Sequence, residues 1–450
     1  MNGIAGKYAG RAVPRYTSYP TAPHFTDAVD ADVAARWLSQ LSPKAPASVY
    51  LHVPFCAEMC AYCGCTTKAT RRIDPVIAYT ETLAREIALV RRHIGRRQPV
   101  SHIHWGGGTP SMIPGGTFLA LSARLREAFA IAPDAEQAIE LDPRTVDRTL
   151  ASTLCKAGIT RVSLGIQDTD PTVQTAIGRL QPDAVVYAAF EHLRAAGLTR
   201  INADLMYGLP HQTPDTVRRT VETMAILSPS RVSVFGYAHV PWAKTHQRLI
   251  DESALPDAGA RLLLEATMRI ALQEAGYVPI GLDHFARPDD PLAKAAKGGW
   301  LRRNFQGYTT DTADALIGIG ASSIGKLPEG YIANAADVGS WRRAVEAGRL
   351  PVARGFALTN GDRLRGSVIE QLMTCYSVDF ADPQLARFGD GLALLDEAEP
   401  HLREPIRDGL ATLDRTQLHV TRAGRPYVRI LAACFDAYLA RGKARHSAAV

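Results

Sequence analysis

The stretch Cys56-Ala57-Glu58-Met59-Cys60-Ala61-Tyr62-Cys63-Gly64-Cys65 is the most informative part of this 450-residue chain. Its first three cysteines are spaced C-x3-C-x2-C and offer three thiolates to an iron–sulfur cube. A cube has four irons, so a loop with three ligands leaves one iron open. An open iron can bind a substrate or a cofactor, which an electron-transfer cluster with all its irons ligated cannot do. The stretch also follows the first predicted strand, at residues 48–53.

Composition is typical of a soluble globular protein, with 46% hydrophobic and 21% charged residues. A chain of this length predicts two domains, one of them large. We expect a cytoplasmic protein with no membrane partner, because no run of about 18 apolar residues exists and the N-terminus lacks the apolar core of a signal peptide. The net charge of +6 is too small and dispersed to indicate a nucleic-acid partner. Four of the seven cysteines lie within residues 56–65, which favours metal ligation over disulfides in a cytosolic chain.

From about residue 48 the sequence alternates short apolar runs with longer amphipathic stretches. Strands are predicted at residues 48–53, 101–105, 137–141, 160–166, 200–206 and 231–237. Between them, Asp74-Pro75 and Thr213-Pro214 are typical helix starts, and Gly158 and Gly197 are typical helix ends. Six β-then-α units indicate a parallel sheet with right-handed crossovers. We therefore expect an α/β fold with a partial (β/α)6 TIM-like barrel over residues 41–355, and a flat doubly wound sheet is the alternative.

The sequences on both sides of this region lack its alternation of strands and helices. Residues 1–40 are predicted to form an extended N-terminal arm over the active site, because residues 15–23 combine aromatics and prolines without a helical or strand period. The alternative is a disordered tail, but such tails rarely concentrate tyrosine. Residues 356–450 are predicted to form a separate, mainly helical C-terminal domain. Its expected elements are helices at 362–375 and 383–388, a β-wing from 410–413 and 418–420 with a turn at Gly424, and a final helix ending near Leu439.

Polar or glycine-rich residues follow each predicted strand. They are residues 56–63, residues 106–110, Glu140 with Asp142, Gln167 with Asp168, Asp204, and residues 237–239. Barrels carry their functional residues at the C-terminal ends of the strands, so we interpret this rim as one site. Glu140 and Asp204 are acceptors suited to ammonium or ribose hydroxyl groups. Asp142 has the alternative role of capping the helix that starts at Pro143, and the glycines at 106–108 have the alternative role of a tight turn.

The cysteine spacing, with an aromatic residue before the third cysteine, resembles the radical S-adenosylmethionine superfamily. More distant motifs narrow the resemblance. They are Pro14-Arg15-Tyr16-Thr17-Ser18-Tyr19-Pro20-Thr21, Tyr50-Leu51-His52-Val53-Pro54-Phe55-Cys56, Gly64-Cys65, His104-Trp105-Gly106-Gly107-Gly108-Thr109-Pro110, Asp204-Leu205-Met206-Tyr207-Gly208-Leu209-Pro210, Asp283-His284-Phe285-Ala286-Arg287-Pro288 and Asn304-Phe305-Gln306-Gly307-Tyr308-Thr309-Thr310. Together they resemble the oxygen-independent coproporphyrinogen III oxidase family over residues 8–440, almost the whole chain.

This resemblance implies the conversion of two propionates of coproporphyrinogen III into vinyl groups in anaerobic haem biosynthesis, giving protoporphyrinogen IX and carbon dioxide. In this superfamily the open iron of a [4Fe–4S] cluster binds S-adenosylmethionine. Cleavage of the sulfonium by one electron gives a 5′-deoxyadenosyl radical, which takes a hydrogen from the propionate β-carbon. The resemblance also implies two bound molecules of S-adenosylmethionine. The expected partners are the porphyrinogen and an external one-electron donor of the flavodoxin or ferredoxin type, and the chain is expected to be a monomer.

The family's site residues carry over to matching positions of this sequence. The implied cluster ligands are Cys56, Cys60 and Cys63. The implied contacts of the cluster-bound S-adenosylmethionine are Tyr50, Gly107, Glu140 and Ile324. Those of the second molecule are Tyr62, Gly108, Thr109, Gln167, Arg179, Asp204 and Ala238. The residues expected to be catalytic are Tyr50, His52, Glu140, Arg179 and Gln306.

Four further residues and the function itself keep alternatives. Tyr62 either places its ring beside the cofactor or only shields the cluster. Cys65 is either a fourth cluster ligand or a neighbour of the site, and we favour the neighbour because one glycine separates it from Cys63. His52 is either a proton donor or a packing residue, and Arg15 either pairs with a substrate carboxylate or is a solvated charge. The alternative function is a haem chaperone of the same superfamily. That class lacks the N-terminal motif and the Gly-Cys pair, both present here. A plain electron carrier is a third, less favoured hypothesis.

Overall fold

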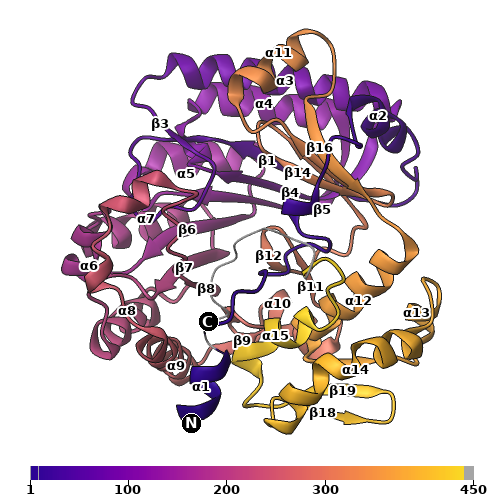
Figure 1. Ribbon diagram of the computed structural model, residues 1–450. Helices are drawn as coiled ribbons and strands as arrows, with labels where there is room; N and C mark the ends of the chain where they lie inside the picture. The colour runs from indigo at the N-terminus through magenta and orange to yellow at the C-terminus, as the bar shows by residue number, and fades with distance from the viewer. Residues whose placement is uncertain (1, 9, 440–450) are drawn as a thin grey trace.

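The computed structural model describes residues 2–8 and 10–439, and its centre is a 12-stranded sheet (Figure 1). The strand order is β16-β15-β14-β13-β1-β4-β5-β6-β7-β8-β10-β9. All six predicted strands are present and run parallel to one another. They are β1 (Ala47–Val53), β4 (Gln98–Gly107), β5 (Phe129–Leu141), β6 (Arg161–Gln167), β7 (Ile201–Tyr207) and β8 (Arg231–Gly236). The predicted α/β fold is confirmed, and the curved sheet is consistent with a partial barrel.

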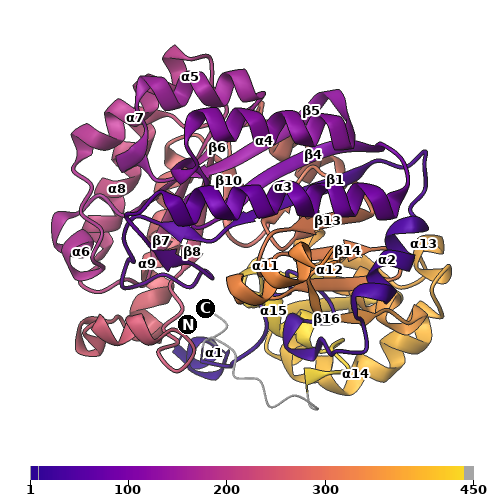
Figure 2. The ribbon, with the colours of Figure 1, turned by 90° about the horizontal axis from the view of Figure 1, so that it is seen from above.

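Helices cover the outer face of these strands, as the view from above shows (Figure 2). They are α3 (Asp74–Ile94), α4 (Gly115–Ala128), α5 (Arg148–Ala157), α7 (Asp183–Ala195), α8 (Pro214–Leu227) and α9 (Ala258–Glu274). Thr213 caps α8 as predicted, and Gly158 ends α5 with a left-handed φ of 89°. The prediction that Asp74 caps α3 is wrong. Asp74 is already helical and its carboxylate faces Arg72 instead of the free backbone N–H groups.

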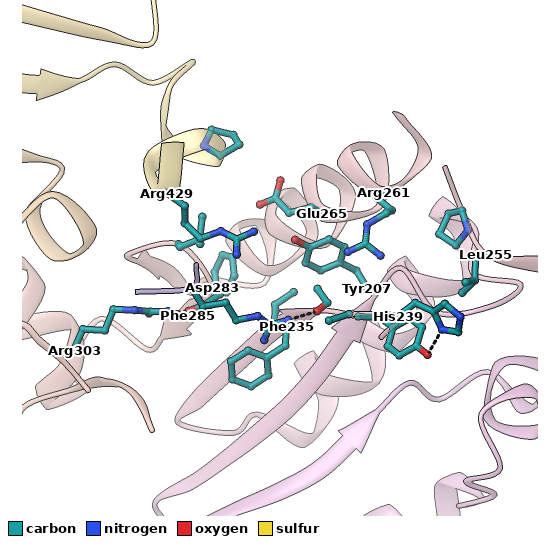
Figure 3. Close-up of a pocket in the computed structure, with 18 of the residues that line it drawn as sticks. Tyr207, Phe235, His239, Leu255, Arg261, Glu265, Asp283, Phe285, Arg303 and Arg429 are labelled. Carbon is teal, nitrogen blue, oxygen red and sulfur yellow. Dashed lines mark hydrogen bonds and ion pairs between the residues drawn. The ribbon is translucent and has the colours of Figure 1, made fainter. Parts of the chain in front are cut away.

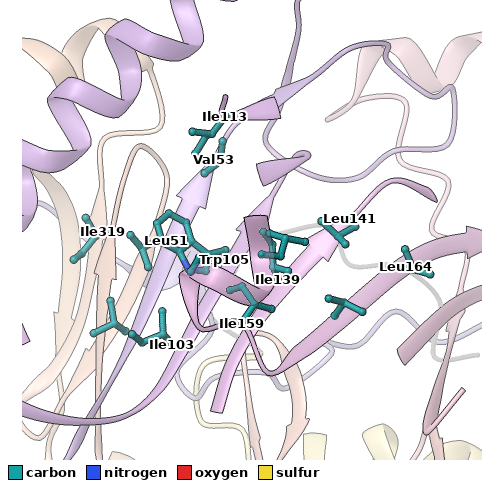
Figure 4. Close-up of a cluster of buried hydrophobic side chains, with 14 of the residues drawn as sticks. Leu51, Val53, Ile103, Trp105, Ile113, Ile139, Leu141, Ile159, Leu164 and Ile319 are labelled. Atoms are coloured by element: carbon teal, nitrogen blue, oxygen red, sulfur yellow. The ribbon is translucent and has the colours of Figure 1, made fainter. Parts of the chain in front are cut away.

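The core lies between the sheet and these outer helices (Figure 4). Alternate residues of each strand point outward into it, including Leu51 and Val53 of β1, Trp105 of β4 and Leu164 of β6, all at most 1% exposed. Because side chains alternate along a strand, the residues between them face the interior of the barrel. The apolar outer face therefore fixes which residues line the inside.

Antiparallel strands extend the sheet on both sides. Beyond β1 lie β13 (Ala315–Ile319), which is parallel to β1, and then β14 (Ile324–Leu327), β15 (Gly330–Asn334) and β16 (Val352–Ala357). At the other edge β10 (His284–Ala286) and β9 (Val278–Ile280) follow β8. The turn after β13 is fixed by Glu86 of α3. Its buried carboxylate accepts hydrogen bonds from Gly320 N at 2.8 Å, Trp341 Nε1 at 2.7 Å and Asn334 Nδ2 at 2.6 Å.

The N-terminal segment crosses between the barrel and the C-terminal elements (Figure 1). It is not extended throughout, because it contains the helices α1 (Asn2–Tyr8) and α2 (Ala31–Ser39). α2 has an apolar face whose Trp37 joins the main core. Between these helices Tyr16 and Tyr19 are buried in the C-terminal core, and Arg15 Nη2 donates to Gly236 O at 3.1 Å, at the rim of the barrel. The middle of the segment thus reaches the rim.

The C-terminal elements are α12 (Asn360–Cys375), α13 (Pro383–Ala386), α14 (Gly391–Arg407), α15 (Val428–Ala433) and the three strands β17 (Ser377–Asp379), β18 (Ala411–Asp414) and β19 (Gln417–Val420). The β-wing is present, and its hairpin turns at Arg415, which has a left-handed φ of 51°. The turn predicted at Gly424 is also present after β19, where Gly424 N donates to Thr421 O at 3.0 Å. The prediction of a final helix ending near Leu439 is wrong, since α15 ends at Ala433. The sequence reading also missed α14, which contains two prolines.

The proposed domain boundaries near residues 40 and 355 stay predictions. β16 crosses the second of them as an edge strand of the main sheet. Residues 1, 9 and 440–450, which belong to the predicted arm and C-terminal domain, lie outside the described residues. Within the described part of the chain, no helix combines the length and the apolar character needed to cross a membrane.

Candidate active site

The inner face of the barrel is polar where the outer face is apolar. Tyr50 and His52 alternate with the core residues of β1, and Glu140 and Asp204 point inward from β5 and β7. Neighbouring strands supply hydrogen bonds to these groups: His104 of β4 bonds to Glu140 at 3.0 Å, and the hydroxyl of Ser163 donates to Asp204 at 2.6 Å. The strand pattern therefore brings polar side chains from five strands, β1 and β4 to β7, to one interior.

The cysteine loop leaves the C-terminal end of β1 at the mouth of this interior. Two groups from other elements point at its sulfur atoms. Arg179 Nη1 donates to Cys60 Sγ at 3.4 Å, and Thr109 Oγ1 donates to Cys56 Sγ at 3.6 Å. Burial raises the pKa of Cys56 and outweighs the contact from the Thr109 hydroxyl, which acts to lower that pKa.

A second segment holds the far side of the loop through its carbonyl groups. Gln247 Nε2 donates to Tyr62 O at 2.9 Å, His246 Nε2 to Cys63 O at 2.6 Å, and Lys244 Nζ to Cys65 O at 2.9 Å. Sequence reasoning missed these three residues, because a contact made to backbone carbonyl groups imposes no recognisable motif.

The glycines at 106–108 bring β4 against the cysteine loop. Gly108 N donates to Val53 O at 2.8 Å and Thr109 N donates to Phe55 O at 2.7 Å. A Cβ atom on Gly108 would lie only 2.4 Å from Phe55 O, and one on Gly107, whose φ is 114°, would lie 2.6 Å from the ring of His52. Glycine is therefore required at Gly108 by close approach to the Phe55 backbone, and at Gly107 by the left-handed φ and the nearby His52 ring.

Tyr50 and His52 form a hydrogen-bonded chain toward the loop. His52 Nε2 lies 3.0 Å from the carbonyl of Thr66, so this nitrogen carries the proton, and Nδ1 accepts from the Tyr50 hydroxyl at 3.0 Å. Burial lowers the pKa of His52 and raises that of Tyr50. A neutral histidine with both ring nitrogens engaged fits the packing and positioning alternative better than proton donation.

Glu140 and Asp204 have opposite electrostatic settings. Burial alone would raise the pKa of Glu140, but hydrogen bonds from His104 and from Gly107 N, the latter 3.0 Å long, lower it below its usual value. Burial raises the pKa of Asp204 despite the hydrogen bond from Ser163, and the charge of Glu140 adds to the rise. Glu140 is thus the ionised acceptor of the pair, suited to an ammonium group.

Arg179 connects the rim of the barrel to the cysteine loop. Besides Cys60, it reaches Gly165 O at 2.8 Å and pairs with Asp142 at 3.3 Å. Burial opposes its charge, but Tyr62 and Asp142 keep its pKa above the usual value. Asp142 also accepts from Arg144 N at 3.0 Å, so it both caps the 3-10 helix Pro143–Thr145 and fixes Arg179. The capping role of Asp142 is confirmed, and its role in the site stays a prediction.

A cavity of about 200 Å³ opens beside the cysteine loop. Five of the sequence-predicted site residues line it, namely Tyr50, His52, Glu140, Gln306 and Ile324. Gln306 comes from the turn between β11 (Arg302–Asn304) and β12 (Gly307–Thr309), and Ile324 begins β14. Tyr50 and Ile324, 274 positions apart in sequence, therefore share one cavity.

The residues predicted for a second S-adenosylmethionine are less closely grouped. Gln167, at the end of β6 with a left-handed φ of 66°, lies near Arg179, since a Cβ on Gly165 would approach both side chains within 3.2 Å. Ala238, by contrast, lines a different and larger cavity beyond the end of β8. The roles of both predicted sets stay predictions.

The donor set fits a cluster held by three thiolates. The three cysteines lie on one loop, hydrogen-bond donors point at two of the sulfurs, and the adjoining cavity carries an ionised acceptor. Within residues 2–8 and 10–439, no three His, Cys, Asp or Glu side chains are grouped as ligands of a single metal ion. The ligand roles of Cys56, Cys60 and Cys63 therefore rest on the thiol chemistry and the loop, and they stay a prediction.

The family to which this chain belongs follows from comparison with known proteins. Residues 50–224 match the Radical SAM superfamily. Over 447 residues the chain is 50% identical to an oxygen-independent coproporphyrinogen III oxidase of Bradyrhizobium diazoefficiens, and the match covers 99% of both chains. The chain belongs to the oxygen-independent coproporphyrinogen III oxidase family.

Other members of this coproporphyrinogen III oxidase family agree with that assignment. The oxygen-independent coproporphyrinogen III oxidase of Paracoccus denitrificans is 41% identical over 97% of this chain and 96% of its own. The solved structure of the Escherichia coli enzyme HemN, described as a radical SAM enzyme, superposes with a TM-score of 0.89 at 36% identity, over 95% of this chain and 100% of that one. The family resemblance read from the motifs is confirmed.

Proposed function

We propose that this chain is a radical S-adenosylmethionine enzyme that decarboxylates two propionate side chains of coproporphyrinogen III to vinyl groups, giving protoporphyrinogen IX for haem synthesis without oxygen. The observation that carries the proposal is the loop of Cys56, Cys60 and Cys63 at the mouth of a cavity lined by Tyr50 and Glu140, in a chain that matches oxidases of this name along its whole length. The cofactors of this enzyme are a [4Fe–4S] cluster and two molecules of S-adenosylmethionine.

When bound, these cofactors supply a one-electron cleavage that generates a species able to abstract hydrogen from the substrate. The chain's own residues prepare the site for it. Glu140, kept ionised by His104, offers a carboxylate to the ammonium group of the cofactor. Arg179 and Thr109 donate hydrogen bonds to the sulfur atoms of Cys60 and Cys56. Gly107 and Gly108 lack side chains, so the β4 backbone lies directly against the cluster loop.

Further elements of the proposal concern partners and location. We propose that a flavodoxin or ferredoxin supplies the electron. The cluster loop favours this, because Cys65 at its tip is exposed and gives a partner a short path to the thiolates. We propose that the chain acts as a monomer in the cytoplasm, where reducing conditions keep its seven cysteines as thiols or ligands.

The test is anaerobic turnover. The reconstituted and reduced protein, given S-adenosylmethionine and coproporphyrinogen III, is expected to form protoporphyrinogen IX and 5′-deoxyadenosine. Absence of both products with an intact cluster would overturn the proposal. The haem-chaperone alternative predicts the reverse pattern, namely stable stoichiometric haem binding with no turnover of coproporphyrinogen.

A further inference from the structure

A second cavity, of about 330 Å³, lies beyond the end of β8 and is lined by four arginines. Figure 3 labels three of them, Arg261, Arg303 and Arg429. They come from four separate parts of the chain: Arg15 from the N-terminal segment, Arg261 from α9, Arg303 from β11 and Arg429 from α15. The strand end itself contributes Ala238. Such convergence is not a product of one basic stretch of sequence, because the four positions are far apart.

Arg303 provides the observation that points to a ligand. Its side chain is only 5% exposed, and its Nε and Nη1 atoms have no hydrogen-bond partner among the described residues. Its nearest acid is Asp283, 3.6 Å from Nη1, a distance too long for a hydrogen bond. A buried guanidinium with free donors is costly unless an acceptor binds it. The structure therefore leaves room for an anion here.

The other arginines are close enough to repel one another. Burial lowers the pKa of Arg429 to about 10, and the charges of Arg15 and Arg303 contribute to the drop. The pKa of Arg261 is also lowered, by burial and by Arg15. Like charges gathered around a cavity are unfavourable in the empty protein and become favourable when an anion joins them.

Acidic residues only partly balance this charge. Two carboxylates line the same cavity, Asp283 and Glu265, against four guanidinium groups, which leaves an excess of 4 − 2 = 2 positive charges. Glu265 is already paired with Arg269, 2.9 Å away on the same helix, and Asp283 lies 2.7 Å from His284 as well as 3.6 Å from Arg303. The cavity is thus suited to a ligand with more than one negative charge.

We propose that this cavity is a carboxylate subsite that holds propionates of the tetrapyrrole while another propionate reacts beside the cluster loop. The proposal deepens the proposed function and rests on it. The cavity also has apolar walls from Val234, Phe235 and Phe285, which suit the hydrocarbon part of a tetrapyrrole edge. Arg15 enters the site from the N-terminal segment, and its guanidinium donates a hydrogen bond to Gly236 O at the rim.

S-adenosylmethionine is the other source of a carboxylate near Ala238. Its carboxylate sits beside an ammonium group, and its sulfonium is a further positive charge, so the molecule as a whole is a cation. A cavity with excess positive charge disfavours it. A tetrapyrrole with several ionised propionates is a polyanion and is favoured. The charge balance therefore selects the propionates.

The test compares binding by variants of the cluster-loaded protein without turnover. Coproporphyrin III, the stable fluorescent oxidation product of the substrate, is titrated into wild type, Arg429→Gln and Arg261→Gln under anaerobic conditions, and S-adenosylmethionine binding is measured in parallel. Each variant is expected to weaken coproporphyrin III binding about tenfold or more, because a charge-assisted contact is lost, and to leave S-adenosylmethionine binding within about twofold.

The matched control is Arg302→Gln. Arg302 neighbours Arg303 in sequence but lines only a separate cavity under the N-terminal segment, so its substitution is expected to leave coproporphyrin III binding unchanged. Thermal unfolding of each variant checks the fold. The two substituted residues lie on different helices, α15 and α9, so if one variant does not fold the other still provides the test.

Three results would overturn the subsite: unchanged coproporphyrin III affinity in both variants, an equal loss in the Arg302→Gln control, or a loss of S-adenosylmethionine binding alone. The binding assay is independent of catalysis. If the variants lose coproporphyrin III but the wild type forms no protoporphyrinogen, the proposed function fails, and only the binding of carboxylates by the cavity is retained.

Discussion

Replacing Gly108 with alanine is expected to separate the glycine loop from the cluster loop. The new Cβ would lie 2.4 Å from the carbonyl oxygen of Phe55, 2.8 Å from its carbonyl carbon and 2.9 Å from its nitrogen. All three are backbone atoms and cannot rotate away. Restoring an ordinary contact of about 3.4 Å requires a shift of about 1 Å, since carbon and oxygen cannot approach much closer.

Such a shift breaks two hydrogen bonds, from Gly108 N to Val53 O and from Thr109 N to Phe55 O. At about 0.5–1.5 kcal/mol each, their loss costs about 1–3 kcal/mol. Overpacking adds about 1–3 kcal/mol, so the free energy of unfolding is expected to fall by roughly 2–6 kcal/mol. The same displacement moves Cys56, the first predicted ligand, relative to Thr109.

The assay is urea unfolding together with iron content after anaerobic reconstitution. Gly116→Ala is the matched control: this glycine lies in α4 with no atom within 4 Å of an added Cβ, so alanine is expected to be neutral or to stabilise by up to about 1 kcal/mol. A Gly108→Ala protein that unfolds like wild type and binds a full complement of iron would refute the reasoning.

Three further predictions test other parts of the site. Cys60→Ser is expected to abolish the cluster and Cys65→Ser to retain it, as iron content and visible spectra would report; loss of the cluster in both would make Cys65 a ligand. Glu140→Gln is expected to weaken S-adenosylmethionine binding about tenfold or more in equilibrium dialysis, because it removes an ionised acceptor; unchanged affinity would exclude that role. Burial raises the pKa of Glu86 to about 7, so the folded state keeps a proton that the unfolded state releases above about pH 4.5. The free energy of unfolding of wild type relative to Glu86→Gln should therefore fall by about 3 kcal/mol between about pH 4.5 and 7, and a pH-independent difference would contradict the shift.

Much of the barrel could be predicted from the sequence because its signals are local. Short apolar runs and helix punctuation such as Thr213-Pro214 and Gly158 act within a few residues, and the six predicted strands match the structure to within a few positions at most ends. The β5 strand is the exception. It begins at Phe129, well before the predicted residue 137, because charged and small residues along its first half hide the pattern.

The C-terminal elements were harder to predict. α14 carries Pro400 and Pro405, which normally argue against a helix interior, and the packing of Leu394 and Leu402 into the C-terminal core outweighs this local signal. The extent of the last helix depends on tertiary contacts that no short window contains. Propensity is a weak prior in such places.

The candidate site divides in the same way. Motif residues such as Glu140 and Gln306 could be identified because the family's motifs mark them, and the structure places both at one cavity. Arg261 and Arg429 lie outside every recognised motif. Only the folding of α9 and α15 around the end of β8 brings them together, so the sequence carried no signal for the arginine-lined cavity.

The most direct test of the central claim follows hydrogen from substrate to cofactor. Coproporphyrinogen III deuterated at the propionate β-carbons is incubated anaerobically with the reduced protein and S-adenosylmethionine, and the 5′-deoxyadenosine formed is analysed by mass spectrometry. The account predicts deuterium in 5′-deoxyadenosine together with formation of protoporphyrinogen IX. Formation of protoporphyrinogen IX with 5′-deoxyadenosine that carries no deuterium would contradict it.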